Sequence, residues 1–410
     1  MLTGTSLAAG IVVYLAVPHV RSLLQGSLGL SSAFSTVSLA LHLVSFFASS
    51  LVEEEHELWY FFLATSLLLE AFDAARDALS RGGQKGFWSS RLCTTLSALV
   101  LHRIAMAFTM GKRRRWTMGE DRLPPPLIAD AFDTSALVDL APAIESLPAI
   151  PALVVSLVSL ALFERRERRG SGSKTGRALL LLGLTAVAAR CGGVVSDASC
   201  SIVVWLIVAV GVGARMLVGV PISALSLLVP LLALLVRRGY LPLLAVTDAI
   251  GEALARIGEG PAANKRDSVA GLVATAMTAA VFYQGFANSI PSIDIAVGYT
   301  GLSAYHEITV GVQIVLAAYA PVLCLARGYV GSLSPASTSS TAAASLAVHL
   351  VTRRAVSLLG CCLSLLAFSS HLFVWSVFAP RFLFELAHIT VFALGYGISR
   401  ICDGTTNCIF

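Results

Sequence analysis

The chain has 410 residues, of which 56% are hydrophobic and only 13% are charged, and its mean hydropathy is +0.80. Soluble globular domains carry about 25% charged residues, so this composition excludes an ordinary soluble protein. The net charge of +5 lies in short basic clusters beside apolar runs, which favours contacts with lipid headgroups over nucleic-acid binding.

Apolar runs with the length of a membrane-spanning helix recur along the chain. A bilayer core needs about 20 apolar residues per helix, and about ten to twelve segments qualify or nearly do. These candidates are 3–20, 31–51, 57–75, 90–110, 147–163, 178–194, 198–218, 220–236, 268–287, 307–327, 355–379 and 382–401. In lipid the backbone must satisfy its own hydrogen bonds, and the runs lack the alternation of barrel strands. The expected fold class is therefore all-α, a polytopic transmembrane helical bundle in which residues 1–410 form one transmembrane domain.

Three stretches, 111–146, 237–267 and 328–354, interrupt this pattern. The first combines the basic run 112–115 with three consecutive prolines and an amphipathic run, so we expect a segment at the membrane interface. The third is rich in serine and threonine, which predicts a flexible linker. No stretch without apolar runs is long enough to form a catalytic domain of ordinary size.

An acidic cluster joins the apolar runs 31–51 and 57–75. It consists of Glu53, Glu54, Glu55, His56 and Glu57, and it directly precedes Trp59 and Tyr60. Capping of the next helix explains one or two of these acids, each worth about 0.3–1 kcal/mol, but not four. We therefore expect either a helix cap alone or a cap that also holds a cation. That cation would be a metal ion, an ammonium headgroup or an arginine from another segment.

A second polar cluster separates the apolar runs 268–287 and 307–327. Its members, interleaved with glycines, are Gln284, Asn288, Ser289, Ser292, Asp294, Tyr299, Tyr305, His306 and Glu307. A polar break at membrane depth is tolerated only where it lines a cavity or is buried in protein. The cluster is a site candidate, and a plain loop at the membrane surface is the alternative.

Single ionisable or polar residues also occur inside the apolar runs, namely His42, Glu70, Asp73, His102, Arg103, Arg190, Arg215 and Glu385. Such groups cost several kcal/mol in lipid unless they pair, face a cavity or reach the interface. Ion pairs between helices are the simplest explanation, and a functional path is the alternative. The sequence has no HExxH motif, no CxxC pair, no phosphate-binding loop and no GxSxG elbow, so we expect no metal site and no catalytic residue of these kinds.

Three segments resemble a known family in the same order along the chain. They read FFASSLVEEEHELWYFF at 46–62, GFANSIPSIDIAVGYTGLSAYHEITVGVQ at 285–313 and HLFVWSVFAPRFLFE at 371–385. All three are similar to the membrane region of the GPI ethanolamine phosphate transferases, and most of all to the member that modifies the second mannose. One family feature is absent, because the polar Asn-Gln-Thr-Gly run expected near Arg103 reads AFTMGK here.

The resemblance implies a multi-pass protein of the endoplasmic reticulum membrane that acts in GPI-anchor synthesis and binds or presents lipid substrate. Family enzymes transfer phosphoethanolamine from phosphatidylethanolamine to a mannose hydroxyl. Their zinc-dependent catalytic domain precedes the membrane region, and nothing in 1–410 resembles it, so this chemistry and its zinc are expected outside the chain. The implied partners are membrane lipids, namely a GPI intermediate and phosphatidylethanolamine, together with a small membrane subunit, and no nucleic acid.

The residues expected to contact lipid substrate come from the two polar clusters, together with one arginine inside an apolar run. They are Glu53, Glu54, Glu55, His56, Arg103, Asn288, Ser289, Ser292, Asp294 and Tyr299. Two other classes of function remain open at this point. In a transporter or flippase the intramembrane charges would line a solute path, and in a structural subunit they would only stabilise the fold.

Overall fold

The computed structural model describes residues 30–47, 52, 54–80, 90–117, 140–145, 154, 157–159, 161, 174–218, 224–258, 263–286, 293–302, 304–333, 337–370, 381–382, 385 and 388. Its helices are α2 (Leu30–Ser45), α4 (Glu55–Ser80), α5 (Ser90–Thr117), α6 (Leu140–Glu145), α8 (Lys174–Cys191), α9 (Asp197–Val218), α10 (Ala224–Leu235), η2 (Arg238–Tyr240), α11 (Leu241–Gly258), α12 (Ala263–Phe282), η4 (Ile295–Tyr299), α13 (Glu307–Ser332) and α14 (Ser337–Ala367). Within the described residues every regular element is helical. In the part of the chain that the structure describes, five helices contain stretches long and apolar enough to cross a membrane, namely α4, α5, α9, α13 and α14. The expected helical membrane fold is confirmed.

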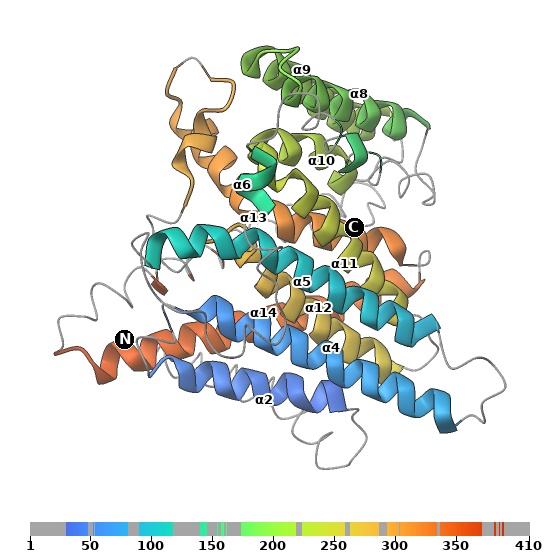
Figure 1. Ribbon diagram of the computed structural model, residues 1–410, viewed down its shortest axis with the longest axis vertical. Coiled ribbons are helices and arrows are strands. Elements are labelled where there is room, and N and C mark those ends of the chain that lie inside the picture. Colours follow the sequence, from blue (N-terminus) through green and yellow to red (C-terminus); the bar gives the residue numbers. More distant parts are fainter. Residues whose placement is uncertain are drawn as a thin grey trace.

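The helices form two groups that meet at α11 and α13 (Figure 1). At one end, α2, α4, α5, α12 and α14 lie alongside one another, and at the other end α8 and α9 lie beside α10 (Figure 1). Each group has its own buried apolar cluster, and both clusters include side chains of α11 and α13. These two helices therefore join the halves of the bundle.

Helices α11 and α13 approach each other closely because glycines face the contact. A Cβ atom on Gly251 would lie 2.1 Å from the carbonyl oxygen of Leu325, and one on Gly328 would lie 2.0 Å from that of Asp248. Small residues permit such contact between backbones in membrane helices. Beside the contact, Nη1 of Arg327 donates a hydrogen bond to Oδ1 of Asp248 at 3.1 Å, and both side chains are buried. The contact thus combines close packing with a neutralised charge.

The structure corrects two of the three expected interruptions. The range 237–267, expected to interrupt the helices, contains α11 and the start of α12. The ionisable side chains of α11 are paired, Asp248 with Arg327 and Glu252 with Arg256. Pairing removes most of the cost of placing charges on a buried helix. A range that contains several charged residues can therefore still form a buried helix.

The range 328–354 is mostly helical rather than a flexible linker, since α13 ends at Ser332 and α14 begins at Ser337. Hydroxyl side chains on a helix satisfy themselves by donating to the preceding turn, as Thr352 does to the carbonyl of Val348 at 2.8 Å. Serine and threonine are therefore compatible with a membrane helix. In the range 111–146, α5 continues to Thr117 and α6 covers the end, whereas 118–139 lie outside the described residues.

Candidate functional site

Glu55 is the first residue of α4, and only 2% of its surface is exposed. The amino end of a helix carries a partial positive charge, which favours a carboxylate at this position. Nε1 of Trp59, one turn further on, donates a hydrogen bond to Oε1 of Glu55 at 2.9 Å. A buried carboxylate still needs a counter-charge, because desolvation without a partner is very costly.

Arg381 supplies that counter-charge from near the other end of the chain. Its Nε lies 2.7 Å from Oε2 of Glu55, and its Nη2 donates to Oε1 at 2.8 Å. The guanidinium therefore contacts both carboxylate oxygens, through one charge-assisted hydrogen bond and one close ion-pair contact. Nη1 of Arg381 lies 2.5 Å from Oε1 of Glu385, and Nη1 of Arg354 on α14 reaches the same oxygen at 3.3 Å. Negative and positive charges therefore alternate along a row of four side chains. We call this row, Glu55, Arg381, Glu385 and Arg354, the ion network.

Two further polar side chains border the ion network. His42 on α2 is fully buried, with Nε2 at 2.8 Å from Oγ of Ser357 and 3.8 Å from Oε1 of Glu55. Arg353 on α14 is also buried, and its guanidinium carbon lies 5.3 Å from the centre of the Trp59 ring. The start of α4 is thus surrounded by polar groups from α2, α14 and the region of Arg381.

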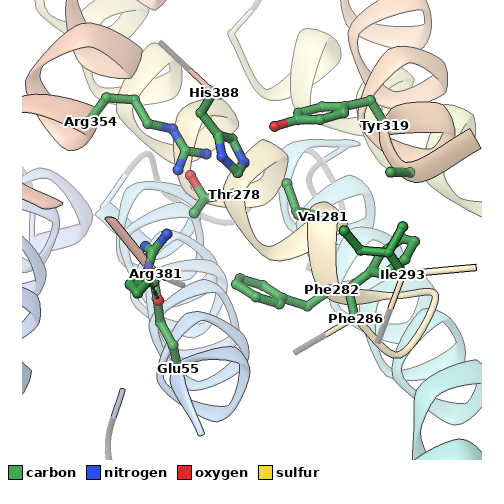
Figure 2. A pocket seen from close by; sticks show the side chains of 11 residues that line it. Glu55, Thr278, Val281, Phe282, Phe286, Ile293, Tyr319, Arg354, Arg381 and His388 are labelled. Carbon is green, nitrogen blue, oxygen red and sulfur yellow. Dashed lines mark hydrogen bonds and ion pairs between the residues drawn. The ribbon is translucent and has the colours of Figure 1, made fainter. Parts of the chain in front are cut away.

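A cavity of about 40 Å³ lies beside the ion network (Figure 2). Since one water needs about 10–15 Å³ on this measure, the cavity has room for about three. Its lining residues are Glu55, Thr278, Val281, Phe282, Phe286, Ile293, Ala318, Tyr319, Arg354, Arg381 and His388. Charged groups form one part of the wall and apolar side chains the rest. Because Glu55 begins α4 and Phe282 ends α12, the cavity lies at one end of these two helices.

The acidic cluster divides between a buried residue and exposed ones. Glu55 lines the cavity, whereas Glu54 and Glu57 are exposed, and Nε2 of the half-buried His56 lies 3.8 Å from Oε1 of Glu57. Glu53 lies outside the described residues. Of the three cations considered for this cluster, the structure places an arginine from another segment beside Glu55.

Among the described residues of the segment 284–307, the cavity lining contains two apolar side chains and no member of the second polar cluster. Asn288, Ser289 and Ser292 lie outside the described residues. Asp294 accepts a hydrogen bond from Nε of Arg237 at 2.6 Å, and Tyr299 is 46% exposed. The structure does not place these two residues, or the exposed Arg103 on α5, in the cavity lining. Ile293 and Phe286 line it instead.

Sequence reasoning missed Arg381, Arg354 and Tyr319 and noted Glu385 only as a single ionisable residue, although one signal was available. Arg381 and Glu385 are four positions apart in an apolar segment, a spacing that places both on one helical face. The expectation of ion pairs between helices is confirmed for Glu385 with Arg354, and also for Glu70 on α4 with Arg91 on α5. Within the part of the chain that the structure describes, no group of three or more acidic, histidine or cysteine side chains could hold a metal ion.

The family model of the GPI ethanolamine phosphate transferase membrane region matches residues 1–116 and 194–401. The chain belongs to this family. The matched ranges contain all three segments that carry the resemblance, and they also contain the ion network and every residue that lines the cavity. No solved structure matches the chain.

Two relatives share shorter stretches with this GPI ethanolamine phosphate transferase membrane region. The human protein named GPI ethanolamine phosphate transferase 2, catalytic subunit, is 28% identical over 166 residues, which are 40% of this chain and 17% of the relative. The GPI ethanolamine phosphate transferase 2 of Schizosaccharomyces pombe is 28% identical over 115 residues, which are 28% of this chain and 14% of the relative. The matched stretch therefore spans less than a fifth of either relative's length.

Proposed function

We propose that the chain is the membrane-embedded part of a transferase of the endoplasmic reticulum that adds phosphoethanolamine to the second mannose of the GPI glycolipid. In this proposal the membrane region binds and presents the lipid substrate. The observation that carries it is the cavity beside the ion network, which combines charged and apolar walls within the family-matched ranges. Both relatives described above are named as the second transferase, which supports the position on the glycolipid.

The proposed division of labour assigns the bond-making chemistry to a separate catalytic domain and its zinc ions. The residues of this chain would contribute by holding a lipid in a fixed position. Holding a reactant in place lowers the entropy cost of the reaction, an effect that does not require a catalytic side chain in the membrane region. The mixed wall of the cavity suits a molecule with a polar head and an apolar body.

The experiment joins this chain to the catalytic domain of the Schizosaccharomyces pombe relative, in cells that lack that relative. Phosphoethanolamine on the second mannose is then measured by mass spectrometry of the accumulated GPI intermediates. We expect the fusion to restore the modification. The matched control joins the same catalytic domain to an unrelated helical membrane anchor, which should not restore it.

Equal activity of the two fusions would contradict the proposal, since any anchor would then suffice. Fluorescence microscopy of the tagged fusion tests the location, and we expect it in the endoplasmic reticulum. If the fusion is found there at normal levels without restoring the modification, the transporter and structural-subunit classes become the better explanations.

A further inference from the structure

Two side chains in the cavity wall, Arg354 and Tyr319, have hydrogen-bond donor groups without acceptors among the described residues. Arg354 makes one hydrogen bond there, from Nη1 to Glu385 at 3.3 Å, and Glu385 already contacts Arg381 at 2.5 Å. The other N–H groups of Arg354 make no hydrogen bond to a described residue. The hydroxyl of Tyr319 likewise makes no hydrogen bond to a described residue, and it points towards His388 and Thr278 (Figure 2). Donors without acceptors in a cavity indicate a ligand that carries acceptor atoms.

The fixed charges around the cavity favour an anion. Three arginines lie in or beside the ion network, Arg353, Arg354 and Arg381, whereas it contains two carboxylates, Glu55 and Glu385. An unbalanced positive charge is costly away from water, and a bound anion would offset it.

The approach of such an anion is restricted by Glu385. Oε2 of Glu385 accepts no hydrogen bond from the described residues. The negative charge on this oxygen would therefore repel an anion. Oε1 of the same side chain is held between Arg381 and Arg354. An anion would therefore bind on the side of Arg354 that faces away from Glu385, near Tyr319 and the ring of His388 (Figure 2).

The size and the apolar part of the wall select the kind of anion. A cavity of about 40 Å³ accommodates a group of only a few heavy atoms. Beside the donors lie Val281, Phe282 and Ile293, which suit carbon chains and disfavour a strongly hydrated free ion. A lipid phosphodiester has one negative charge, unshared acceptor oxygens and attached carbon chains, and it matches each of these features.

We propose that this cavity is a subsite for the phosphodiester of a membrane phospholipid, whose free oxygens accept hydrogen bonds from the guanidinium of Arg354 and the hydroxyl of Tyr319. This inference rests on the proposed function in taking the ligand to be a lipid. Arg354 and Tyr319 are binding residues in this account. Arg381 is a positioning residue, since it holds Glu385, which in turn orients Arg354.

The test uses the full chain in an uncharged detergent and two photoreactive lipid probes with identical acyl chains. One probe is a phosphatidylethanolamine and the other is the corresponding diacylglycerol, which lacks the phosphate. We expect the phospholipid probe to label the protein at a saturable site near α13 and α14, and the diacylglycerol probe to label it weakly.

Substitutions then identify the donors. Arg354→Gln should lower the apparent affinity for the phospholipid probe about tenfold or more, as expected for a lost charge-assisted hydrogen bond. Tyr319→Phe should lower it by a smaller factor. Arg354→Lys keeps the charge but loses the planar fork, and should fall between Arg354→Gln and the wild type. Arg256→Gln is the matched control, because Arg256 pairs with Glu252 on α11 and does not line the cavity, and it should bind normally.

Three results would overturn the inference: equal labelling by the two probes, unchanged affinity in both Arg354 variants, or competition by inorganic phosphate at the affinity of the probe. The last result would identify free phosphate as the ligand. Failure of the proposed function looks different. In that case the phospholipid probe would still bind through Arg354, while the fusion to a catalytic domain would not modify the second mannose.

Discussion

The guanidinium of Arg381 and the carboxylate of Glu55 form a buried two-point ion pair between residues 326 positions apart in the sequence, with Nε 2.7 Å from Oε2 and Nη2 2.8 Å from Oε1. Both residues also line the cavity. The pair therefore ties the region of Arg381 to the start of α4 and completes the charged wall.

Removal of Arg381 should destabilise the protein strongly. Arg381→Gln leaves Glu55 and Glu385 close together in a buried site without their shared counter-charge. Loss of one partner of a buried ion pair costs about 3–5 kcal/mol. The measurement is the free energy of unfolding of the purified chain in detergent, by denaturant titration.

A double variant controls for the loss of side-chain volume. Glu55→Leu combined with Arg381→Met removes one charge of each sign and leaves Glu385 paired with Arg354. Replacing a buried pair with apolar residues of similar size is often neutral, so the double variant should recover most of the lost stability. Wild-type stability in Arg381→Gln would refute the structural role of the pair.

Two neighbouring glutamates should respond differently to the same change. Glu55→Gln removes the charge that Arg381 contacts, so both stability and transfer by the fusion should fall. Glu54→Gln changes an exposed side chain and should alter stability by no more than about 0.5 kcal/mol. Thermal unfolding and the transfer assay measure the two effects. Equal effects of the two substitutions would contradict the assignment of Glu55 to the ion network.

The close contact between α11 and α13 should not accept a methyl group. In Gly328→Ala the new Cβ atom would meet the carbonyl oxygen of Asp248 at 2.0 Å, so the helices must separate. Overpacking of this kind costs about 1–3 kcal/mol. Gly331→Ala is a matched control on the same helix, because nothing lies within 4 Å of its Cβ position. Equal unfolding free energies for the two variants would contradict the packing described.

The pair between Asp294 and Arg237 should matter more for transfer than for stability. Arg237 is 56% exposed, and an exposed ion pair contributes about 1 kcal/mol at most. Asp294 nevertheless precedes η4 and adjoins Ile293, which lines the cavity. Asp294→Asn should therefore reduce transfer by the fusion a few-fold while the unfolding temperature stays close to that of the wild type. Unchanged transfer at normal protein levels would show that the segment around Asp294 does not contribute to transfer.

Apolar length predicted the membrane helices well where charges were few. The runs 57–75 and 307–327 correspond to α4 and α13, each of which extends several residues beyond the prediction. Helix α11 was missed because Asp248, Glu252 and Arg256 resemble a loop in composition. Their partners were not visible in the sequence, since Arg327 is 79 positions from Asp248.

The site was only partly predictable for the same reason. The crowding of acids around Glu55 indicated a cation, and an arginine from another segment was among the possibilities. Which arginine it is depends on the tertiary fold, since 326 positions separate the two residues. Arg354 carried no local signal, because it follows Arg353 at the end of a range expected to be a flexible linker. Tyr319 carried none either, because a tyrosine in a membrane helix is more often a packing or interface residue than a ligand.

The most direct test of lipid presentation by this membrane region compares the fusion carrying the wild-type region with the same fusion carrying Arg354→Gln. Phosphoethanolamine on the second mannose is measured at equal protein levels, with Arg256→Gln as the control. We expect Arg354→Gln to reduce the modification about tenfold, because a charge-assisted hydrogen bond to the lipid is lost, and Arg256→Gln to leave it unchanged. Wild-type modification by the Arg354→Gln fusion would contradict the claim that this cavity presents the substrate.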